Sequence, residues 1–317
     1  MGTTEILLME PVFKKRIWGG NAIYLFFGLP LSDEKIGEAW VISAHPNGPS
    51  RIKGKEWEGI TLDQLYQSRR DLFGNDPSPV FPLLTKVLDA RDRLSVQVHP
   101  NDEMAKKTEN ALGKSECWYI LDALPNGQLV IGHHAKNQLE LTTMTQKNQW
   151  DQLLRTVSVR KGDFIDIPAG TVHAIGAGIQ ILETQQSSDI TYRLYDYDRM
   201  DETTGKQREL HLEKGLVATT VPAILPPLLH FDDREGRFMM VQNDHFTVEK
   251  WTIFQSLTLP NENHHYYLCT LISGNATING VSVKTGNSFI ITSLTKEITI
   301  LGNTQIIVSY PHIEVHS

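Results

Sequence analysis

Alternating apolar and polar residues predict short β-strands along most of this chain. The clearest run is Phe164-Ile165-Asp166-Ile167, which follows a turn signal at Gly162-Asp163. A first stretch, residues 5–60, mixes short strand candidates with turns rich in Gly and Pro. Mainly β structure is therefore expected. The other strand candidates in the first two thirds of the chain are residues 80–90, 94–99, 114–121, 179–186 and 190–197.

Two of these strands are predicted to gather polar side chains on one face. Side chains two residues apart in a strand point to the same side. The strand that ends at His99 therefore presents Gln97 and His99 together, and the next one presents Lys114, Glu116 and Trp118 together.

Helical spacing predicts a few helices between the strands. Residues 61–73 repeat Leu near helical spacing, with Thr61 as the N-cap. Residues 101–112 and 209–219 each predict a short helix, and residues 138–156 predict one or two.

A boundary is predicted at Val221–Pro227, because its three prolines end a helix and stiffen the chain. Turn dipeptides at Gly274-Asn275 and Asn279-Gly280 separate strand-like runs beyond it. Short strands at regular spacing suggest a sandwich or barrel. The predicted strands are residues 246–254, 266–273, 275–278, 281–284, 287–292, 297–301 and 304–310.

The second half echoes the first. Gly286 to Ile291 parallels Gly162 to Ile167, but the following turn, residues 292–295, has no Pro, Gly or His. We therefore expect two barrels in tandem, of which only the first keeps metal ligands. The expected units are a catalytic, metal-binding barrel with helical additions over residues 1–225 and a smaller barrel without ligands over residues 226–317.

Composition narrows the functional classes. The chain has 317 residues, 40% of them hydrophobic, and a formal net charge of −7. There is no basic excess to hold nucleic acid, so local Lys and Arg residues must attract any anionic substrate. Neither a secretory signal nor a bilayer-spanning stretch is visible, and Cys117 and Cys269 make no disulfide framework. A cytoplasmic protein is expected.

A third segment carries metal-ligand chemistry. Gly162 is followed after five residues by Pro168-Ala169-Gly170 and, two residues later, by His173. Pro168 and Gly170 predict a tight turn that presents the His173 ring. A second His and a carboxylate are available on the strands of His99 and Glu116.

The run from Gly162 to His173 resembles the second motif of the cupin superfamily of β-barrels. The surrounding sequence resembles the type I mannose-6-phosphate isomerases, most closely their short bacterial branch, from about Met9 to the end of the chain. This resemblance implies two cupin-like double-stranded β-helix (jelly-roll) barrels with peripheral α-helices. The segments that carry it are Ile17–Gly20, Gly37–Ser43, Leu94–Pro100, Lys114–Tyr119, Pro168–Ile175 and Gln185–Arg193.

The resemblance also implies a metal centre. Gln97, His99, Glu116 and His173 match the metal ligands of the family. Two imidazoles, a carboxylate and an amide oxygen suit one zinc ion per chain, with open positions for water or substrate.

Other candidate ligands are weaker. His264-His265 lies in the second barrel without a carboxylate or a Pro-x-Gly turn, which favours a surface or structural role, and His133-His134, which follows a turn, is expected to have a similar role. Cys117 lies between Glu116 and Trp118 on the opposite strand face, which favours a small core residue.

The family implies interconversion of D-mannose 6-phosphate and D-fructose 6-phosphate through an enediolate. Arg193 matches the active-site arginine and is assigned to the enediolate charge. Lys114 is assigned to proton handling or a substrate oxygen, and Asp189 to orienting Arg193 or carrying the proton. These pairs of roles stay open at this stage.

Two residues are candidates for substrate binding. Arg199 is basic at a family position suited to the phosphate group, although the neighbouring acids could simply neutralise it. Trp18 is assigned to the wall of the pocket, with plain core packing as the alternative.

Two rival functions remain. Another metal-dependent cupin enzyme, such as an iron oxygenase, would use the same fold. A non-catalytic sugar-phosphate-binding cupin would keep the pocket without turnover. The expected partner is a small sugar phosphate, with no nucleic acid or membrane, and the chain is expected to be a monomer or a homodimer.

Overall fold

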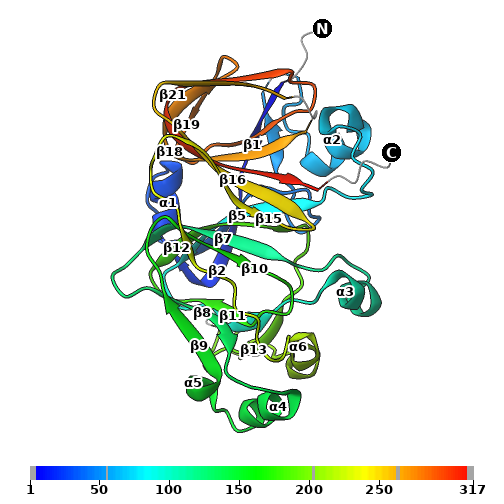
Figure 1. Ribbon diagram of the computed structural model, residues 1–317, viewed down its shortest axis with the longest axis vertical. Helices are drawn as coiled ribbons and strands as arrows, with labels where there is room; N and C mark the ends of the chain where they lie inside the picture. The colour runs from blue at the N-terminus through cyan, green and yellow to red at the C-terminus, as the bar shows by residue number, and fades with distance from the viewer. Residues whose placement is uncertain (1–4, 55, 202–203, 262–264, 313–317) are drawn as a thin grey trace.

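The structure, a computed structural model, describes residues 5–54, 56–201, 204–261 and 265–312. Within these residues, strands in three sheets make up most of the regular structure, and the helices lie around them (Figure 1). The prediction of a mainly β chain with peripheral helices is confirmed.

Two of the sheets enclose the candidate site. An apolar cluster that includes Trp118, Ile165, Ile131 and Ile175 fills the space between them. The seven-stranded sheet has the order β14 (Leu229–His230), β10 (Asp163–Ile167), β7 (Glu116–Ala123), β12 (Ile179–Gln186), β5 (Leu83–Ala90), β2 (Val12–Gly20) and β3 (Ile36–Ile42). The five-stranded sheet has the order β13 (Tyr192–Tyr195), β6 (Val96–Val98), β11 (His173–Ile175), β8 (Gln128–His133) and β9 (Leu154–Ser158).

The third sheet forms the upper part of the molecule in Figure 1. Its nine strands follow the order β15 (Gly236–Gln242), β16 (Phe246–Ile253), β21 (Glu297–Pro311), β18 (Tyr267–Ile278), β20 (Ser288–Ile291), β1 (Ile6–Glu10) and β4 (Arg51–Lys53), with β17 (Ser256–Pro260) on β21 and β19 (Val281–Lys284) on β18.

Strand pairing crosses the expected boundary between residues 225 and 226. The first strand, β1, is antiparallel to β20, and β4 pairs with β1 on its other side. Side chains on one face of β1, Leu7 and Met9, are buried in one apolar cluster, while Ile6 and Leu8 on the other face pack against a second cluster. The C-terminal sheet is therefore completed by the N-terminal segment of the chain.

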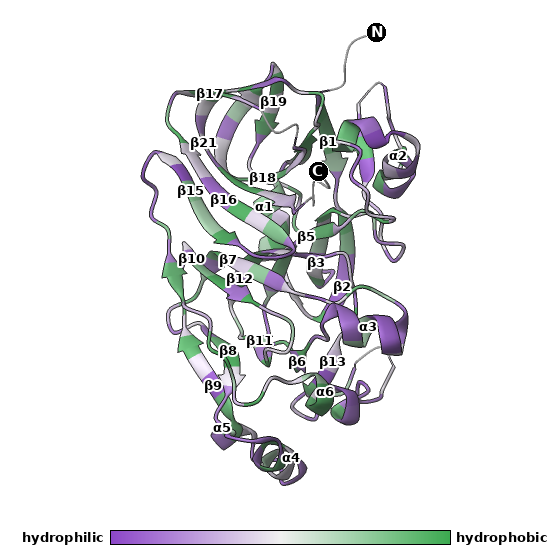
Figure 2. Cartoon of the chain, turned by 45° about the vertical axis from the view of Figure 1, so that its right-hand side comes forward, coloured by the Kyte–Doolittle hydropathy of each residue, from purple (hydrophilic) through white to green (hydrophobic). Residues whose placement is uncertain are grey.

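The helices are short and lie at the edges of the sheets. Figure 2 shows that α3 is mainly hydrophilic, and only Ala105 in it is buried. No described helix has the length and apolar character needed to cross a membrane. The helices are α1 (Ala22–Phe27), α2 (Leu62–Ser68), η1 (Arg70–Phe73, a 3-10 helix), α3 (Asp102–Glu109), α4 (Gln138–Gln146), α5 (Trp150–Leu153) and α6 (Leu212–Ala218).

One predicted turn is wrong. Gly274-Asn275 does not separate two strands, because β18 continues through it with a bulge between Leu271 and Ser273. Gly274 has a φ of +84°, and a Cβ there would lie 2.0 Å from the carbonyl oxygen of Asn303. The glycine therefore permits close approach of β18 and β21 and a local bend. Similarly, the two strands predicted at 297–301 and 304–310 are one strand, β21.

The alternation of β6 explains how the five-stranded sheet positions the site. Val96 and Val98 are buried against a cluster that includes Leu141, Trp150 and Leu153 from the helical layer. Gln97, between the two valines, points to the opposite face. Apolar packing on the helical side thus holds a polar side chain toward the space between the two sheets.

Leu7→Ala tests the contribution of β1 to the C-terminal half. Leu7 is 1% exposed, so the truncation should lower the free energy of unfolding by about 2–5 kcal/mol in urea denaturation. Leu25→Ala, at a site 69% exposed, is the matched control and should change it by less than about 0.5 kcal/mol. Equal effects of the two substitutions would contradict the role assigned to β1.

Candidate metal centre and substrate cavity

Three of the four predicted ligands meet between the two sheets. The nitrogen and oxygen atoms of His99, Glu116 and His173 lie within 4.8 Å of one another, and all three residues are buried. His99 Nε2 is 3.4 Å from Glu116 Oε2, and His173 Nε2 is 3.4 Å from Glu116 Oε1. One carboxylate from the seven-stranded sheet therefore faces two imidazoles, those of His173 on β11 and of His99 directly after β6.

A turn connects the two histidines through the backbone. Thr171 N–H donates to the Pro168 carbonyl, and Gly170 N–H donates to the His99 carbonyl at 2.9 Å. Gly170 has a φ of +88°, and a Cβ there would lie 2.3 Å from the Thr220 hydroxyl oxygen. The Pro-x-Gly sequence thus allows the chain to turn close to His99 before it enters β11 with His173.

Backbone carbonyls select the tautomer of both rings. His99 Nδ1 is 2.8 Å from the Ile190 carbonyl oxygen, and His173 Nδ1 is 2.8 Å from the Thr171 carbonyl oxygen. Each Nδ1 therefore carries the proton and donates it, which leaves the Nε2 lone pair directed at the centre.

Burial and the neighbouring charges together determine which groups of the cluster are ionised. Burial alone would raise the pKa of Glu116, but the charge of the adjacent Lys114 ammonium holds it well below its usual value. Burial and the nearby Lys114 charge lower the pKa of His99 to about 3, and burial lowers that of His173. The centre therefore has one anionic carboxylate and two neutral imidazoles.

Lys114 is the cation of the cluster. Its Nζ is 2.8 Å from Glu116 Oε2 and 3.1 Å from His99 Nε2, to which it donates. Although burial opposes the charge, Glu116 and Glu183 raise the pKa of Lys114 above its usual value. The Lys114 ammonium is thus protonated beside the carboxylate.

These residues fit a divalent metal ion. Among the described residues neither oxygen of the buried Glu116 carboxylate accepts a hydrogen bond of normal geometry, and two imidazole lone pairs point at it. An anionic oxygen and two neutral nitrogens are a donor set that zinc uses in catalytic sites. Gln97 Nε2 lies 3.2 Å from His173 Nε2. A half-turn of that amide would present its oxygen as a fourth ligand.

A cavity of about 360 Å³ opens beside the centre, and Gln97 and Lys114 line it. Five cationic residues face it against three carboxylates, although the chain as a whole has a net charge of −7. The lining favours an anionic ligand. Its charged members are Arg16, Lys86, Lys114, Arg193, Arg208, Glu38, Glu183 and Asp189.

Besides Gln97 and Lys114, three predicted residues line this cavity: Trp18, Asp189 and Arg193. Trp18 is only 3% exposed and also belongs to the apolar cluster between the sheets, so it contributes to wall and core alike. Arg193 Nε donates to the Ser95 hydroxyl at 3.2 Å and Nη1 to the Glu209 carbonyl at 2.8 Å. Burial and the charge of Arg208 lower the pKa of Arg193.

Asp189 is not bonded to Arg193 in the described part of the chain. Its Oδ2 accepts a hydrogen bond from Asn47 Nδ2 at 3.1 Å. The geometry therefore does not support the interpretation that Asp189 orients Arg193. Asp189 lines the cavity, and its carboxylate is held by Asn47 instead.

Arg199 does not line the cavity. It forms an ion pair with Asp196, donates to the Arg93 carbonyl and lies over the Tyr197 ring at 5.3 Å. The Asp196 carboxylate neutralises the charge of Arg199. This is the alternative that the acidic neighbours of Arg199 suggested in the sequence.

Several charged residues of the cavity were missed from the sequence. Glu183 on β12 accepts from Trp118 Nε1 at 3.0 Å and lies 3.4 Å from Lys86 Nζ, and burial raises its pKa. Arg16 pairs with Glu38 at 2.7 Å. The sequence signal was weak: Glu183 is the one charged residue of Ile179–Gln186, and a buried charge is costly unless it is paired.

The weaker candidates lie outside the centre. His133 Nε2 donates to the Thr220 carbonyl, and within the described residues only His99, Glu116 and His173 form a possible metal cluster. Cys117 is buried in an apolar cluster, as predicted. His265 packs on Tyr310, while His264 is outside the described residues.

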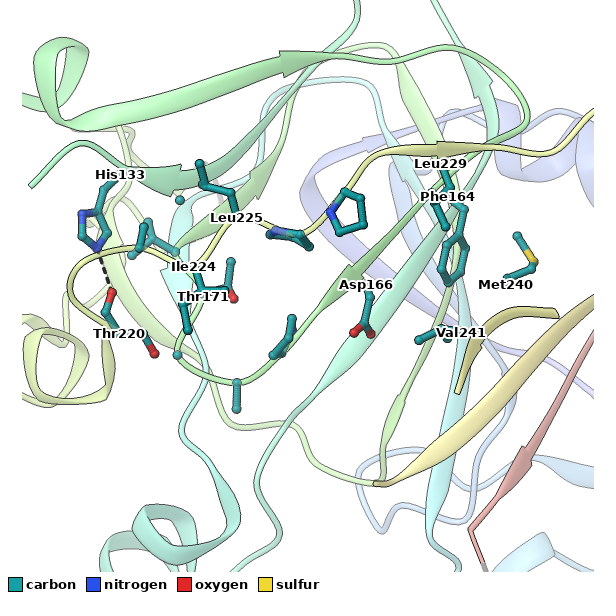
Figure 3. Close-up of a pocket in the computed structure, with 18 residues that line it drawn as sticks. His133, Phe164, Asp166, Thr171, Thr220, Ile224, Leu225, Leu229, Met240 and Val241 are labelled. Carbon is teal, nitrogen blue, oxygen red and sulfur yellow. Dashed lines mark hydrogen bonds between the residues drawn. The ribbon is translucent and has the colours of Figure 1, made fainter. Parts of the chain in front are cut away.

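A second cavity, of about 380 Å³, is lined in part by Pro168 and Gly170 of the turn before His173, and Figure 3 shows other residues of its lining. Its lining is mainly apolar, with Leu225, Leu229 and Met240, and Asp166 points into it. None of the four predicted ligands lines it, so the chemistry belongs to the first cavity.

Comparisons with known proteins agree with this geometry. Residues 6–119 match the family model "Phosphomannose isomerase type I, catalytic domain", and residues 236–311 match "Mannose-6-phosphate isomerase, cupin domain". The chain is 47% identical to the mannose-6-phosphate isomerase ManA of Bacillus subtilis over 86% of this chain and 87% of that protein. It is 42% identical to the Streptococcus mutans mannose-6-phosphate isomerase over 96% and 98% of the two chains.

A solved structure is similar throughout. The crystal structure of a Bacillus subtilis mannose 6-phosphate isomerase aligns with a TM-score of 0.86 and 38% identity, covering 96% of this chain and 99% of that one. The prediction of a cupin-type jelly-roll fold is confirmed.

Protonation of the buried imidazoles should make stability depend on pH. Because the pKa of His99 falls to about 3 on folding, the unfolded chain binds more protons below pH 6.5. The contribution of neutral His99 to the free energy of unfolding is complete above pH 6.5 and is lost as the pH falls toward 3. In chelator, His99→Gln should therefore lose less free energy of unfolding between pH 7.5 and 5 than the unsubstituted protein. His134→Gln, at an exposed position, is the control, and identical losses in all three proteins would contradict the prediction.

Proposed function

The chain belongs to the type I mannose-6-phosphate isomerases, and on that basis we propose that it interconverts D-mannose 6-phosphate and D-fructose 6-phosphate. The observation that supports this most is the buried cluster of Glu116, His99 and His173 beside a cavity with a cationic surplus. Such a cavity suits a small phosphorylated sugar, and the cluster suits a metal-assisted step.

We assign the metal site to His99, Glu116 and His173, with Gln97 as a weaker fourth ligand, and zinc as the ion at one per chain. A bound divalent cation supplies a Lewis acid that stabilises negative charge on the substrate oxygens. The protein residues provide the binding, the orientation and the proton transfer.

We assign Arg193 to stabilise the negative charge that develops on the substrate during the reaction. Removing the proton beside the carbonyl group leaves an enediolate, whose oxygens need a fixed cation. The Arg193 guanidinium lines the cavity and is held by Ser95 and by the Glu209 carbonyl, so little reorganisation accompanies its use.

Lys114 and Asp189 are assigned different tasks in the reaction. Because Lys114 is held protonated beside Glu116, it suits hydrogen-bond donation to a substrate oxygen better than proton abstraction. Asp189 is a carboxylate that lines the same cavity and is oriented by Asn47. We assign Asp189 to carry the proton between the two carbons.

Two variants should distinguish the loss of metal binding from the loss of turnover alone. Glu116→Gln should lower zinc affinity by more than about 100-fold and abolish isomerase activity, because it removes the anionic ligand. Arg193→Ala should retain zinc and lower kcat by about 10²–10³ through loss of charge stabilisation. Zinc content by plasma spectrometry and a coupled fructose 6-phosphate assay measure both.

Glu103→Gln, an isosteric change at an exposed position, is the control and should change neither property. Loss of zinc in Arg193→Ala in parallel with activity would contradict its assigned role. Absence of isomerase activity in the unsubstituted zinc-loaded protein would overturn the proposed function in favour of a binding protein.

Substitutions of two carboxylates test which residue carries the proton. Asp189→Asn should lower kcat by about 10²–10⁴ while zinc is retained, since the carboxamide cannot accept the proton. Exchange of solvent deuterium into the substrate should fall in parallel, as measured by proton NMR. Should Asp189→Asn keep full activity and Glu183→Gln lose it, the proton transfer belongs to Glu183 instead.

A further inference from the structure

The proline-rich segment that was predicted as a domain boundary is fixed at both ends. Residues 221–228, which we call the strap, contain three prolines and therefore have little conformational freedom. Before the strap, the Thr220 carbonyl accepts a hydrogen bond from His133 Nε2 at 3.0 Å. After it, Leu229 is paired with Phe164, where β14 joins β10. The strap is thus anchored to β8 at one end and to β10 at the other.

The strap forms one side of the second cavity (Figure 3). The other sides are formed by β8, β10, β15 and the turn before His173. The volume of about 380 Å³ lies within the range of roughly 300–1,000 Å³ that is typical of small-molecule sites. Among the described residues, none lines both this cavity and the cavity beside the metal cluster. The second cavity is therefore a separate site that exists before any ligand arrives.

Asp166 is the one acidic residue in the described lining of this cavity. Its neighbours Ile165 and Ile167 are buried between the sheets, so alternation along β10 directs Asp166 to the opposite face. The hydrogen bond from Asn243 Nδ2 to its Oδ1 is long, at 3.3 Å. Burial raises the pKa of Asp166 to about 6, and no Lys or Arg is among the described lining residues. Above that pH the cavity thus holds a carboxylate charge without a cation to compensate it.

His133 adds an acceptor that no described residue uses. The side chain is 5% exposed, and burial lowers its pKa, so the ring is neutral. Because Nε2 donates its proton to the Thr220 carbonyl, Nδ1 carries a lone pair. This Nδ1 is buried and has no hydrogen-bond partner among the described residues. Buried polar atoms are normally paired, so an unpaired acceptor in a cavity wall indicates a missing donor.

The rest of the lining is mainly apolar. The strap contributes Leu225, which packs directly on β8 because a Cβ on Gly132 would lie 2.6 Å from its Cδ2. Phe164 and Met240 line the cavity from β10 and β15. A ligand with an apolar body would therefore lose its contact with water against these side chains, which favours binding.

We propose that the second cavity binds a small molecule that consists of a compact apolar body and an ammonium group, with the ammonium on Asp166. Charge complementarity supports this choice, because the described lining carries a carboxylate and an imidazole acceptor but no Lys or Arg. An ammonium has three N–H donors and compensates the buried charge. A phosphorylated sugar does not suit the cavity, since its phosphate would meet the carboxylate. The proposal does not depend on the proposed function.

Calorimetric titration of the zinc-loaded protein with three probes of similar size tests the proposal. The probes are phenethylamine, which is cationic, phenethyl alcohol, which is neutral, and hydrocinnamate, which is anionic. At about pH 8, where Asp166 is ionised, phenethylamine should bind about 10-fold or more tightly than the alcohol. Hydrocinnamate should bind more weakly than either, because its carboxylate is repelled by Asp166.

Two variants locate the bound amine. Asp166→Asn should lower the affinity for phenethylamine by about 10- to 100-fold and leave that for the alcohol unchanged, because only the charged contact is lost. Ala223→Phe, on the strap, fills the cavity and should lower the affinity for both probes. Asp151→Asn and Ala111→Phe make the same changes at exposed positions and should alter neither affinity. Zinc content shows that each variant has folded.

Several results would overturn the proposal. These are equal affinities for the three probes, no binding of phenethylamine at millimolar concentration, or an amine affinity that Ala223→Phe leaves unchanged. The last result would place the amine elsewhere, for instance at the carboxylates beside the metal cluster. If Asp166→Asn does not fold, the three probes measured on the unsubstituted protein and on Ala223→Phe still decide. Preference for the amine that disappears in Ala223→Phe supports the site, and preference that persists overturns it.

Discussion

The buried carboxylate of Glu116 is the constraint on which the rest of the site depends. Taking a charged carboxylate out of water costs several kcal/mol unless a cation and hydrogen bonds compensate it. Lys114 supplies one positive charge, while the neutral imidazoles of His99 and His173 offer lone pairs rather than protons. A divalent cation would satisfy the carboxylate and both lone pairs together. Because Glu116 lies in one sheet and His173 in the other, with His99 directly after β6, the same ion would also link the sheets.

Packing around the cluster explains how such an arrangement stays rigid. Apolar side chains such as Ile131 and Ile165 fill part of the space between the sheets, and the same cluster contributes Trp18, Leu88 and Leu94 to the wall of the charged cavity. The valines of β6 are anchored under the helical layer, so Gln97 faces inward. Turn residues at Pro168 and Gly170 connect the two histidines through a backbone hydrogen bond. The ligands are thus placed by strands and turns whose conformations are determined elsewhere.

Local sequence patterns predicted which candidate ligands share a strand face, whereas the full ligand set came from the family resemblance. Alternation along a strand decides which side chains share a face, so Gln97 with His99 and Lys114 with Glu116 could be paired in advance. Long-range features could not be found in this way. The pairing of β1 with β20 and the continuation of β18 through Gly274 depend on strands distant in the sequence. Arg208 and Glu183 join the cavity through tertiary packing, and no short motif marks them.

The most direct test is a titration of isomerase activity against bound zinc. Protein freed of metal by a chelator would receive zinc in steps, with bound metal and mannose 6-phosphate turnover measured at each step. The account predicts negligible turnover without metal and a linear rise that ends at one zinc per chain. Full turnover by the metal-free protein would contradict the central role given to the Glu116 cluster.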